Sequence, residues 1–373
     1  MAASPVNLNS YSPGLEGVIA GETAISTVEG GLRYRGYPVG ELAEHRLFDD
    51  VAYLLLHGEL PTPTESKAFQ ERVASSRVLH AGVEAVIAAM PASAIPLDVL
   101  RTVVSALSAF DPDVNDNSKA ANLRKAERLL GQMPTAIARF YRQSKGLPAI
   151  EPRKDLSHAA HFLYLIRGQE ASPAEIKALD VSLTLYAEHE FNASTFTARV
   201  IVSTMADLHA GITGAIGALK GPLHGGANEK VMDVLFAAGG PDTAEAWTMQ
   251  ALARKERIMG FGHRVYKSGD VRAGILKTFA ADLAGKVNAE KWEKTADVIE
   301  TIMAREKTMY PNLDWPAGRL YHAMGLEIPL YTPMFAMSRV AGWAAHVDEQ
   351  LGANRLIRPR GLYTGPELRS VKG

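Results

Sequence analysis

The sequence predicts an all-α protein with one small β-hairpin near its N-terminus. From Val39 onward, apolar residues recur at helical spacing in one segment after another. Helix stops followed by N-capping residues separate these segments, as at residues 60–65, 172–175 and 239–242. At a mean helix length near 11 to 12 residues, the pattern predicts roughly 13 to 18 helices.

The hairpin is the one convincing strand signal in the sequence. Residues 23–28 and 32–35 have the composition of two short strands, and the Glu29-Gly30-Gly31 turn between them suits a tight reversal. Beyond the hairpin, the apolar spacing changes from that of a strand to that of a helix.

The chain length predicts two lobes with a cleft between them. At 373 residues the chain exceeds what a single core usually supports. The glycine-rich stretch at 221–226 and the loop before Asp314 are candidate hinges, because hinge positions absorb backbone rotation at the ends of elements. We therefore expect a large helical domain of residues 1–225 and 321–373, which dimerises, and a small mobile domain of residues 226–320.

The composition excludes several classes of protein. A net charge of −1 gives no reason to expect nucleic acid as a partner. Without cysteine there is no disulfide, thiolate nucleophile or thiolate metal site. The longest apolar run, residues 203–219, carries Asp207 and His209, which argues against a membrane span. Since the first basic residue is Arg33, no secretory signal or transit peptide is predicted, and we expect a cytoplasmic protein.

Three motifs imitate known sites but lack an essential residue. The acidic run at 111–116 begins like a calcium loop, but Asp116 stands where the turn glycine belongs. His189-Glu190 is followed by Ala193 instead of the second histidine of a zinc-protease helix. The glycines at 260 and 262 lack the third glycine of a dinucleotide fingerprint. These motifs give no support for calcium, zinc or nucleotide chemistry.

Three other segments each place one proton-handling side chain among small or turn-forming residues. They are residues 221–228 with His224, residues 260–267 with His263, and residues 311–315 with Asp314. Glycine beside a histidine lets backbone and ligand approach closely. Both histidine turns lead into helical patterns, and a helix N-terminus favours a neutral imidazole that can stabilise charge on a substrate oxygen. Two imidazoles and one carboxylate make an acid–base set.

Arginines suggest the kind of substrate. Arg272 follows His263 by nine residues, and Arg339 and Arg358 lie in the C-terminal part of the chain. A guanidinium group matches the two oxygens of a carboxylate, so a dicarboxylate substrate would use two or three of them.

These segments, together with residues 34–37, 187–195 and 358–365, resemble the citrate synthase family, which includes the 2-methylcitrate synthases. The resemblance extends over nearly the whole chain. It implies a citrate synthase-like all-α homodimer in which a small domain closes over the substrates.

By this resemblance, the chain condenses an acyl-CoA with oxaloacetate in a Claisen-type reaction and then hydrolyses the thioester. Asp314 is similar to the base that removes the proton α to the thioester carbonyl, and His224 to the donor that stabilises the enol or enolate oxygen. His263 is similar to the residue that polarises the ketone of oxaloacetate. No metal and no cofactor are implied, because acetyl-CoA is a substrate.

The resemblance also implies binding residues. The oxaloacetate ligands are His189, Arg272, Arg339 and, contributed by the second subunit of the dimer, Arg358, while Phe335 packs beside the condensing centre. For CoA, the backbone of an adenine-binding loop and a lysine near a phosphate are implied, and these residues are Ile258, Met259, Gly260, Phe261, Gly262 and Lys267.

The sequence leaves two alternatives for the acyl donor, acetyl-CoA and propionyl-CoA. Asp314-Trp315 is similar to the 2-methylcitrate branch of the family, whereas residues 358–363 are similar to the citrate branch. One methylene of substrate is worth only about 1 to 3 kcal/mol in a pocket. Citrate synthase is the first hypothesis, with propionyl-CoA as the alternative donor. A non-catalytic, acyl-CoA-responsive dimer is a distant third, because such a protein would not need the base Asp314.

Overall fold

The computed structural model describes residues 11–262, 266 and 269–371. The protein is 62% helix, and its described residues form sixteen α-helices and a small antiparallel sheet, which confirms the predicted all-α fold. Two predicted site residues, His263 and Lys267, lie outside the described residues. Within the described ranges, no helix combines the length and apolar character needed to cross a bilayer.

The helices fall into three groups along the chain. The first ten are α1 (Val39–His45), α2 (Phe48–His57), α3 (Pro63–Ser75), α4 (Ala81–Ala88), α5 (Pro96–Leu107), α6 (Lys119–Ser144), α7 (His158–Arg167), α8 (Pro173–Tyr186), α9 (Ala193–Val202) and α10 (Leu208–Leu219). After the glycine-rich loop come α11 (Ala227–Ala238), α12 (Pro241–Ala253), α13 (Val271–Lys286), α14 (Glu290–Lys307) and α15 (Asp314–Ala323). The last is α16 (Tyr331–Gly352), and short 3-10 turns lie at Pro13–Leu15, Ser108–Phe110 and Ile328–Leu330.

Helix starts follow the capping signals in the sequence. α3 begins after Thr62, whose side chain accepts the backbone N–H of Glu65 while the Glu65 carboxylate accepts the N–H of Thr62. Ser172 and Glu175 form the same reciprocal pair at the start of α8. Each pair satisfies two backbone donors that have no partner inside the helix.

The sheet confirms the predicted hairpin and adds one strand to it. β1 (Ser26–Thr27) pairs antiparallel with β2 (Arg33–Tyr34), and β2 pairs antiparallel with β3 (Tyr37–Pro38). The strands are shorter than the sequence pattern suggested. Arg35 and Gly36 both have positive φ, at 50° and 90°, so the chain reverses directly after β2 and returns beside it.

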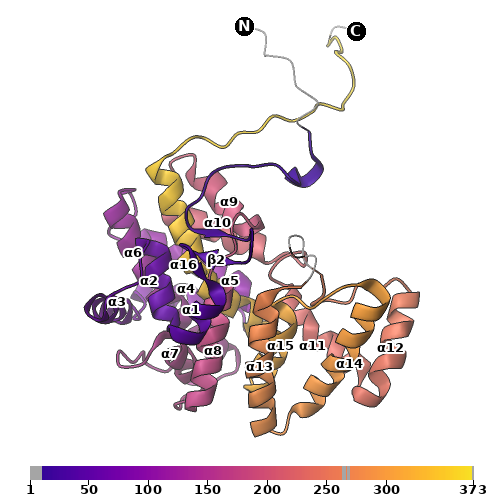
Figure 1. Cartoon of the computed structure of the whole chain (residues 1–373). Coiled ribbons are helices and arrows are strands. Elements are labelled where there is room, and N and C mark those ends of the chain that lie inside the picture. The colour runs from indigo at the N-terminus through magenta and orange to yellow at the C-terminus, as the bar shows by residue number, and fades with distance from the viewer. Residues whose placement is uncertain (1–10, 263–265, 267–268, 372–373) are drawn as a thin grey trace.

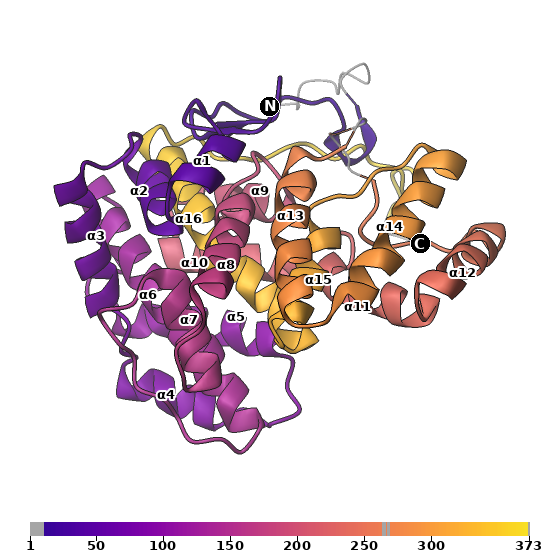
Figure 2. The ribbon, with the colours of Figure 1, turned by 60° about the horizontal axis from the view of Figure 1, so that its bottom comes forward.

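Helix α16 forms the centre of the larger helical group. It packs against α2, α6, α8, α9 and α10, and most of its side chains are buried. Helices α11 to α15 pack chiefly on one another and form a second group, drawn in salmon to orange beside the first (Figures 1 and 2). The boundaries of two domains at residues 226 and 320 remain a prediction.

The acidic loop at 111–116 has arginine partners. Arg128 lies 2.6 Å from carboxylate oxygens of both Asp111 and Asp113, and Arg124 pairs with Asp113. The guanidinium groups neutralise the carboxylates that a calcium loop would present to the ion. These ion pairs hold the loop against the first turns of α6.

Candidate active site

Four parts of the chain meet around Tyr186, the last residue of α8. The Tyr186 hydroxyl donates to Asp314 Oδ1 at 2.7 Å, and its backbone oxygen accepts from Nε of Arg339. Its ring centre lies 4.4 Å from that of Phe335, which in turn lies 6.0 Å from the ring of His224. The fold therefore gathers four of the predicted site residues into one cluster.

Asp314 is the first residue of α15. Asn312 Oδ1 accepts its backbone N–H at 3.1 Å, which fixes the start of the helix. Withdrawal from water raises the pKa of Asp314 to about 6, while the hydrogen bond from Tyr186 acts in the opposite direction. The carboxylate is ionised at neutral pH and is a stronger base than an exposed aspartate, as proton abstraction requires.

His224 is neutral in this environment. Burial lowers the pKa of His224 to about 3, and the positive charge of Arg339 acts in the same direction. The sequence argument attributed a neutral imidazole to the N-terminus of the following helix, α11, which begins at Ala227. In the structure, burial and the charge of Arg339 both favour the neutral form.

The hydroxyl of Ser194 contacts Nε2 of His224, and the direction of this hydrogen bond decides which ring nitrogen carries the proton. Its hydroxyl oxygen lies 2.8 Å from His224 Nε2 and 2.7 Å from Asn192 Oδ1, and it accepts the indole N–H of Trp343 at 3.1 Å. A hydroxyl has one hydrogen, so it donates either to Asn192 or to His224. When it donates to His224, the proton of the neutral imidazole sits on Nδ1, and Nδ1 can then donate to a ligand.

Arg339 is a buried cation with an unused donor. Its Nη1 has no hydrogen-bond partner among the described residues, although the side chain is buried. Burial lowers the pKa of Arg339 to about 10, and the guanidinium lies 4.6 Å from the centre of the Phe335 ring. An anionic ligand in the cluster would satisfy both the charge and the free N–H.

Two other predicted oxaloacetate ligands are Arg272, the second residue of α13, and His189, which lies three residues after the end of α8. Arg272 is held by Asp270 through bonds of 3.0 and 2.7 Å, and its Nη1 donates to Leu185 O at 3.4 Å. Burial lowers the pKa of Arg272, but the ion pair with Asp270 outweighs burial and holds the pKa above its usual range. His189 Nε2 shares a hydrogen bond of 2.9 Å with the Tyr266 hydroxyl.

Arg358 lies outside this cluster. It is exposed and belongs to the segment after α16, which runs away from the helices beside the N-terminal segment (Figure 1). Its predicted place in the site of a second subunit remains a prediction.

The predicted CoA loop is joined to the loop that carries Asp314. Gly262 N donates to Tyr310 O at 2.9 Å, while the backbone and side-chain amides of Asn312 donate to Gly260 O and Gly262 O at 2.9 and 3.0 Å. Gly260 and Gly262 have φ of +88° and +78°, so only glycine adopts this path without strain. Ile258 and Phe261 are buried and Met259 is half-buried, which leaves the backbone to contact a ligand.

A hollow of about 170 Å³ lies beside these joined loops. Its lining residues are Gly262, Tyr266, Gly269, Asp270, Thr308, Met309, Tyr310 and Pro311. It adjoins both the His189–Tyr266 hydrogen bond and the Arg272–Asp270 pair, so it lies at the edge of the cluster.

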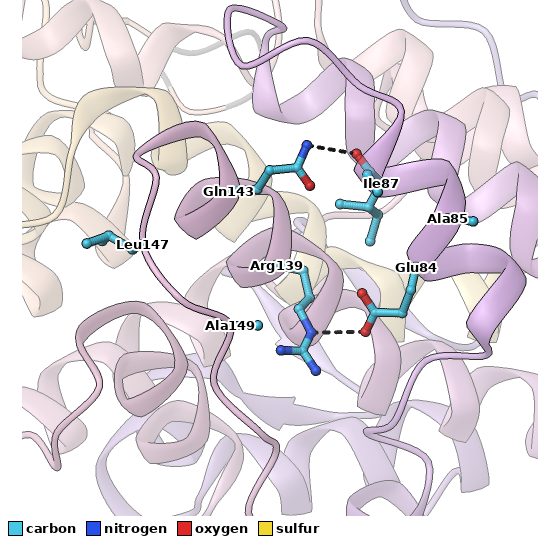
Figure 3. Close-up of a pocket in the computed structure, with 8 residues that line it drawn as sticks. Glu84, Ala85, Ile87, Arg139, Gln143, Leu147 and Ala149 are labelled. Atoms are coloured by element: carbon cyan, nitrogen blue, oxygen red, sulfur yellow. Dashed lines mark hydrogen bonds and ion pairs between the residues drawn. The ribbon is translucent and has the colours of Figure 1, made fainter.

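A larger hollow, of about 370 Å³, lies far from this chemistry between α4 and α6 (Figure 3). Arg139 pairs there with Glu84 at 2.9 Å, and Gln143 Nε2 donates to Ile87 O at 3.1 Å. The polar groups of its wall are thus engaged with one another. It contains none of the predicted site residues.

Sequence reasoning missed Tyr186, Ser194 and Asp270. Tyr186 and Ser194 lie within or beside the 187–195 motif, but nothing in their spacing indicates that they contact Asp314 and His224. Asp270 had a usable signal, because an aspartate directly before an apolar helical pattern predicts an N-cap. It caps α13 and also holds Arg272.

Within the part of the chain that the structure describes, no three His, Cys, Asp or Glu side chains could hold a metal ion together.

Comparison with known sequences gives relatives along the whole chain. The sequence model of "Citrate synthase, C-terminal domain" matches residues 14–360. The 2-methylcitrate synthase of Mycobacterium tuberculosis (strain H37Rv) is 46% identical over 364 residues, covering 96% of this chain and 92% of the relative. Citrate synthase 2 of Bacillus subtilis is 44% identical, covering 95% of this chain and 96% of the relative.

Solved structures give the same result. The citrate synthase of Pyrobaculum aerophilum aligns with a TM-score of 0.90 at 39% identity, covering 96% of this chain and 94% of that protein. The citrate synthase of Thermoplasma acidophilum, solved with carboxymethyl coenzyme A and oxaloacetate, aligns with a TM-score of 0.92 at 35% identity. That alignment covers 96% of this chain and 97% of the other.

Proposed function

This chain belongs to the citrate synthase family of acyltransferases, and we propose that it condenses acetyl-CoA with oxaloacetate to give citrate and CoA. Family membership by itself gives a citrate or 2-methylcitrate synthase activity and does not distinguish between the two. The choice of acetyl-CoA as the donor and the roles of individual residues are our proposal.

One observation carries the proposal. Asp314 is hydrogen-bonded to Tyr186, and the Phe335 ring beside Tyr186 faces both the neutral imidazole of His224 and the guanidinium of Arg339, whose Nη1 has no partner among the described residues. A base, a donor for a developing oxyanion and a buried cation for a carboxylate thus lie in one site. A Claisen-type condensation between a thioester and a dicarboxylate needs these three groups.

The reaction begins with proton removal. Asp314 takes a proton from the carbon α to the thioester carbonyl, and negative charge develops on the thioester oxygen. His224 donates a hydrogen bond to that oxygen from the ring nitrogen that does not contact Ser194. The donor is therefore the N–H of a neutral imidazole, which stabilises the developing charge through this hydrogen bond.

The carbon nucleophile then attacks the ketone carbon of oxaloacetate. A carbon–carbon bond forms, and the ketone oxygen takes up a proton, a step for which we propose His263. Water afterwards attacks the thioester carbonyl, the carbon–sulfur bond breaks, and citrate and CoA leave.

Binding of the two substrates uses the surrounding residues. Arg339, Arg272, His189 and a second subunit's Arg358 are the proposed oxaloacetate ligands, with Phe335 beside the reacting carbons. The backbone of residues 258–262, with Lys267, is the proposed CoA site. The complex of the Thermoplasma citrate synthase with oxaloacetate and carboxymethyl coenzyme A supports this pair of ligands for the fold.

We further propose that residues 226–320 form a small domain that closes over the substrates. Helices α11 to α15 pack chiefly on one another, and the glycine-rich loop that carries His224 enters this group. Closure would exclude water during the condensation and protect the reactive enol from protonation.

The role of Asp314 is tested with Asp314→Ala. We expect oxaloacetate affinity, measured by calorimetry, to stay within about twofold, because Asp314 is not a carboxylate ligand. Turnover should fall at least about a hundredfold, since general-base catalysis contributes typically that much. Retained turnover would contradict the proposed base.

Propionyl-CoA is the second candidate donor. It is favoured by the 46% identity to a protein named 2-methylcitrate synthase and by Trp315 beside the base. The test is release of CoA with oxaloacetate, comparing kcat/KM for acetyl-CoA and propionyl-CoA. A higher value for propionyl-CoA would replace citrate by 2-methylcitrate as the product, and no release with either donor would favour the non-catalytic dimer.

A further inference from the structure

We propose that Trp315 and Glu300 are positioning residues that hold the proposed base Asp314 in register with Arg272 and with the 260–262 loop. The proposal rests on the proposed function, since it takes Asp314 as the base. Both act through the segments that they hold: Trp315 directly follows Asp314, and Glu300 binds the Trp315 indole.

Glu300 links three helices through its two carboxylate oxygens. On α14, its Oε1 accepts the indole N–H of Trp315 at 2.8 Å, and its Oε2 accepts from Nζ of Lys277 on α13 at 2.6 Å. Trp315 is the second residue of α15 and is fully buried. A buried indole N–H needs such an acceptor, so this bond fixes the angle of the ring.

The helices joined by Glu300 begin with the residues that matter for the chemistry. α15 begins at Asp314, directly before Trp315, and Arg272 is the second residue of α13. A shift of α15 relative to α13 would change the distance between the proposed base and a proposed oxaloacetate ligand. The Lys277–Glu300–Trp315 chain opposes that shift.

The face of the Trp315 ring supports the 260–262 loop. A Cβ added to Gly260 would lie 2.7 Å from Cε3 of Trp315, which shows how closely backbone and ring approach. The Phe261 ring packs on the indole with its centre 4.7 Å away. The loop is in turn hydrogen-bonded to Asn312, which caps the backbone N–H of Asp314. The Trp315 ring, the 260–262 loop and Asp314 are therefore connected by direct contacts.

Arg319 completes the support from within α15. Its Nη1 donates to the backbone oxygen of Trp315 at 3.1 Å, and its Nε donates to Glu293 on α14 at 2.8 Å. The guanidinium lies 5.5 Å from the centre of the Trp315 ring. Both the side chain and the backbone of Trp315 are thus tied to α14.

The experiment compares substitutions on the two sides of the indole–carboxylate bond. Trp315→Phe keeps an aromatic ring and removes the N–H, whereas Glu300→Ala removes the acceptor and Glu300→Gln keeps an acceptor oxygen. Trp292→Phe, on α14 beside Phe236 and His322, is the matched control. The readouts are kcat, KM for oxaloacetate, and the isotope effect on kcat/KM with acetyl-CoA deuterated in its methyl group.

We expect Trp315→Phe and Glu300→Ala each to lower kcat about tenfold, because a misplacement well below 1 Å already slows a positioned reaction. The isotope effect should rise, since proton removal becomes slower, while KM for oxaloacetate stays within twofold. The double variant should be no slower than Glu300→Ala alone, because that substitution already removes the acceptor of the indole N–H together with the ion pair to Lys277. Glu300→Gln should lose less than Glu300→Ala, because its one carboxamide oxygen can still accept the indole N–H although the ion pair with Lys277 is lost. Trp292→Phe should remain within twofold of wild type.

Three results would overturn the proposal. The first is a wild-type kcat and isotope effect in both Trp315→Phe and Glu300→Ala, and the second is a loss of kcat with an unchanged isotope effect. The third is a loss in Glu300→Gln as large as in Glu300→Ala. Should Trp315→Phe fail to fold, Glu300→Ala alone decides. Turnover retained by Asp314→Ala would instead overturn the proposed function, whatever these variants show.

Discussion

Burial and one phenolic hydroxyl act in opposite directions on the pKa of Asp314. Burial raises the pKa of Asp314 to about 6, and the hydrogen bond from Tyr186 keeps the pKa from rising further. Since the base acts when ionised, kcat/KM should fall as the pH drops through this pKa.

Tyr186→Phe removes that hydrogen bond and should raise the pKa of Asp314. The acid limb of kcat/KM should therefore move to higher pH, by about half a unit to one unit. Tyr331→Phe is the control, because the buried Tyr331 hydroxyl contacts Leu326 O and not Asp314. An acid limb at the same pH in Tyr186→Phe and wild type would contradict this assignment.

Ser194 should matter for a different reason. Ser194→Ala removes the hydroxyl that contacts Nε2 of His224 and orients its ring, so the oxygen of the developing enolate loses a positioned donor. We expect kcat to fall about tenfold or more, with the acid limb of the pH profile unchanged because Ser194 does not contact Asp314.

Steady-state kinetics across pH would check this expectation. Ser144→Ala is a matched control, since that half-buried hydroxyl donates to Tyr141 O within α6 and contacts none of the proposed site residues. A shifted acid limb in Ser194→Ala would show that the two residues are coupled and that the assignment to His224 is incomplete.

The sequence predicts those site residues that stand in a recognisable local motif, and it misses those whose role depends on contacts between distant segments. His224 and Asp314 stand in glycine-rich or turn-forming motifs, so their chemistry is visible locally. Tyr186 contacts Asp314 across 128 positions of sequence, and Ser194 contacts His224 across 30. Such contacts arise only when the end of α8 meets the start of α15 and α9 meets the glycine-rich loop, and no local pattern encodes them.

At the scale of elements, one glycine of α16 determines how closely that helix approaches the turn before His189. A Cβ added to Gly342 would lie 2.4 Å from the backbone oxygen of Ala187 and 2.3 Å from Glu188 Oε2. Gly342→Ala should lower the free energy of unfolding by about 3 kcal/mol, because the backbone cannot yield to such overpacking. It should also raise KM for oxaloacetate, since the displaced turn carries His189.

Chemical denaturation of Gly342→Ala beside Gly285→Ala would test this expectation. Gly285 lies in α13 with nothing within 4 Å of an added Cβ, so alanine there should stabilise the protein by about 1 kcal/mol. Equal effects of the two substitutions would mean that α16 can move away from the turn.

The sequence predicts elements well where their ends carry capping chemistry. Thr62 with Glu65 and Ser172 with Glu175 marked two helix starts correctly. The third strand, β3, was missed because it is only two residues long and includes Pro38, which offers no strand signal of its own. Its pairing depends on the reversal at Arg35 and Gly36, a tertiary feature of the chain.

For the whole molecule, the open question is whether each site is built from two chains. The cluster around Tyr186 supplies Asp314, His224 and Arg339 from one subunit. Arg358 lies apart from it on an exposed terminal segment that also carries the exposed apolar side chains of Leu356, Leu362 and Tyr363. Exposed apolar residues on an extended arm suit contact with another subunit, which agrees with the predicted sharing of Arg358.

Mixed dimers test this sharing directly. In a dimer of one Asp314→Ala subunit and one Arg358→Ala subunit, one site would lose both groups and the other would keep both. Random mixing gives such dimers half the time, so co-expression of the two inactive variants should restore about one quarter of wild-type activity. The control pairs Asp314→Ala with Arg339→Ala, two residues of the same cluster, and should restore nothing. If Arg358 instead served its own subunit, the first mixture would be as inactive as the control.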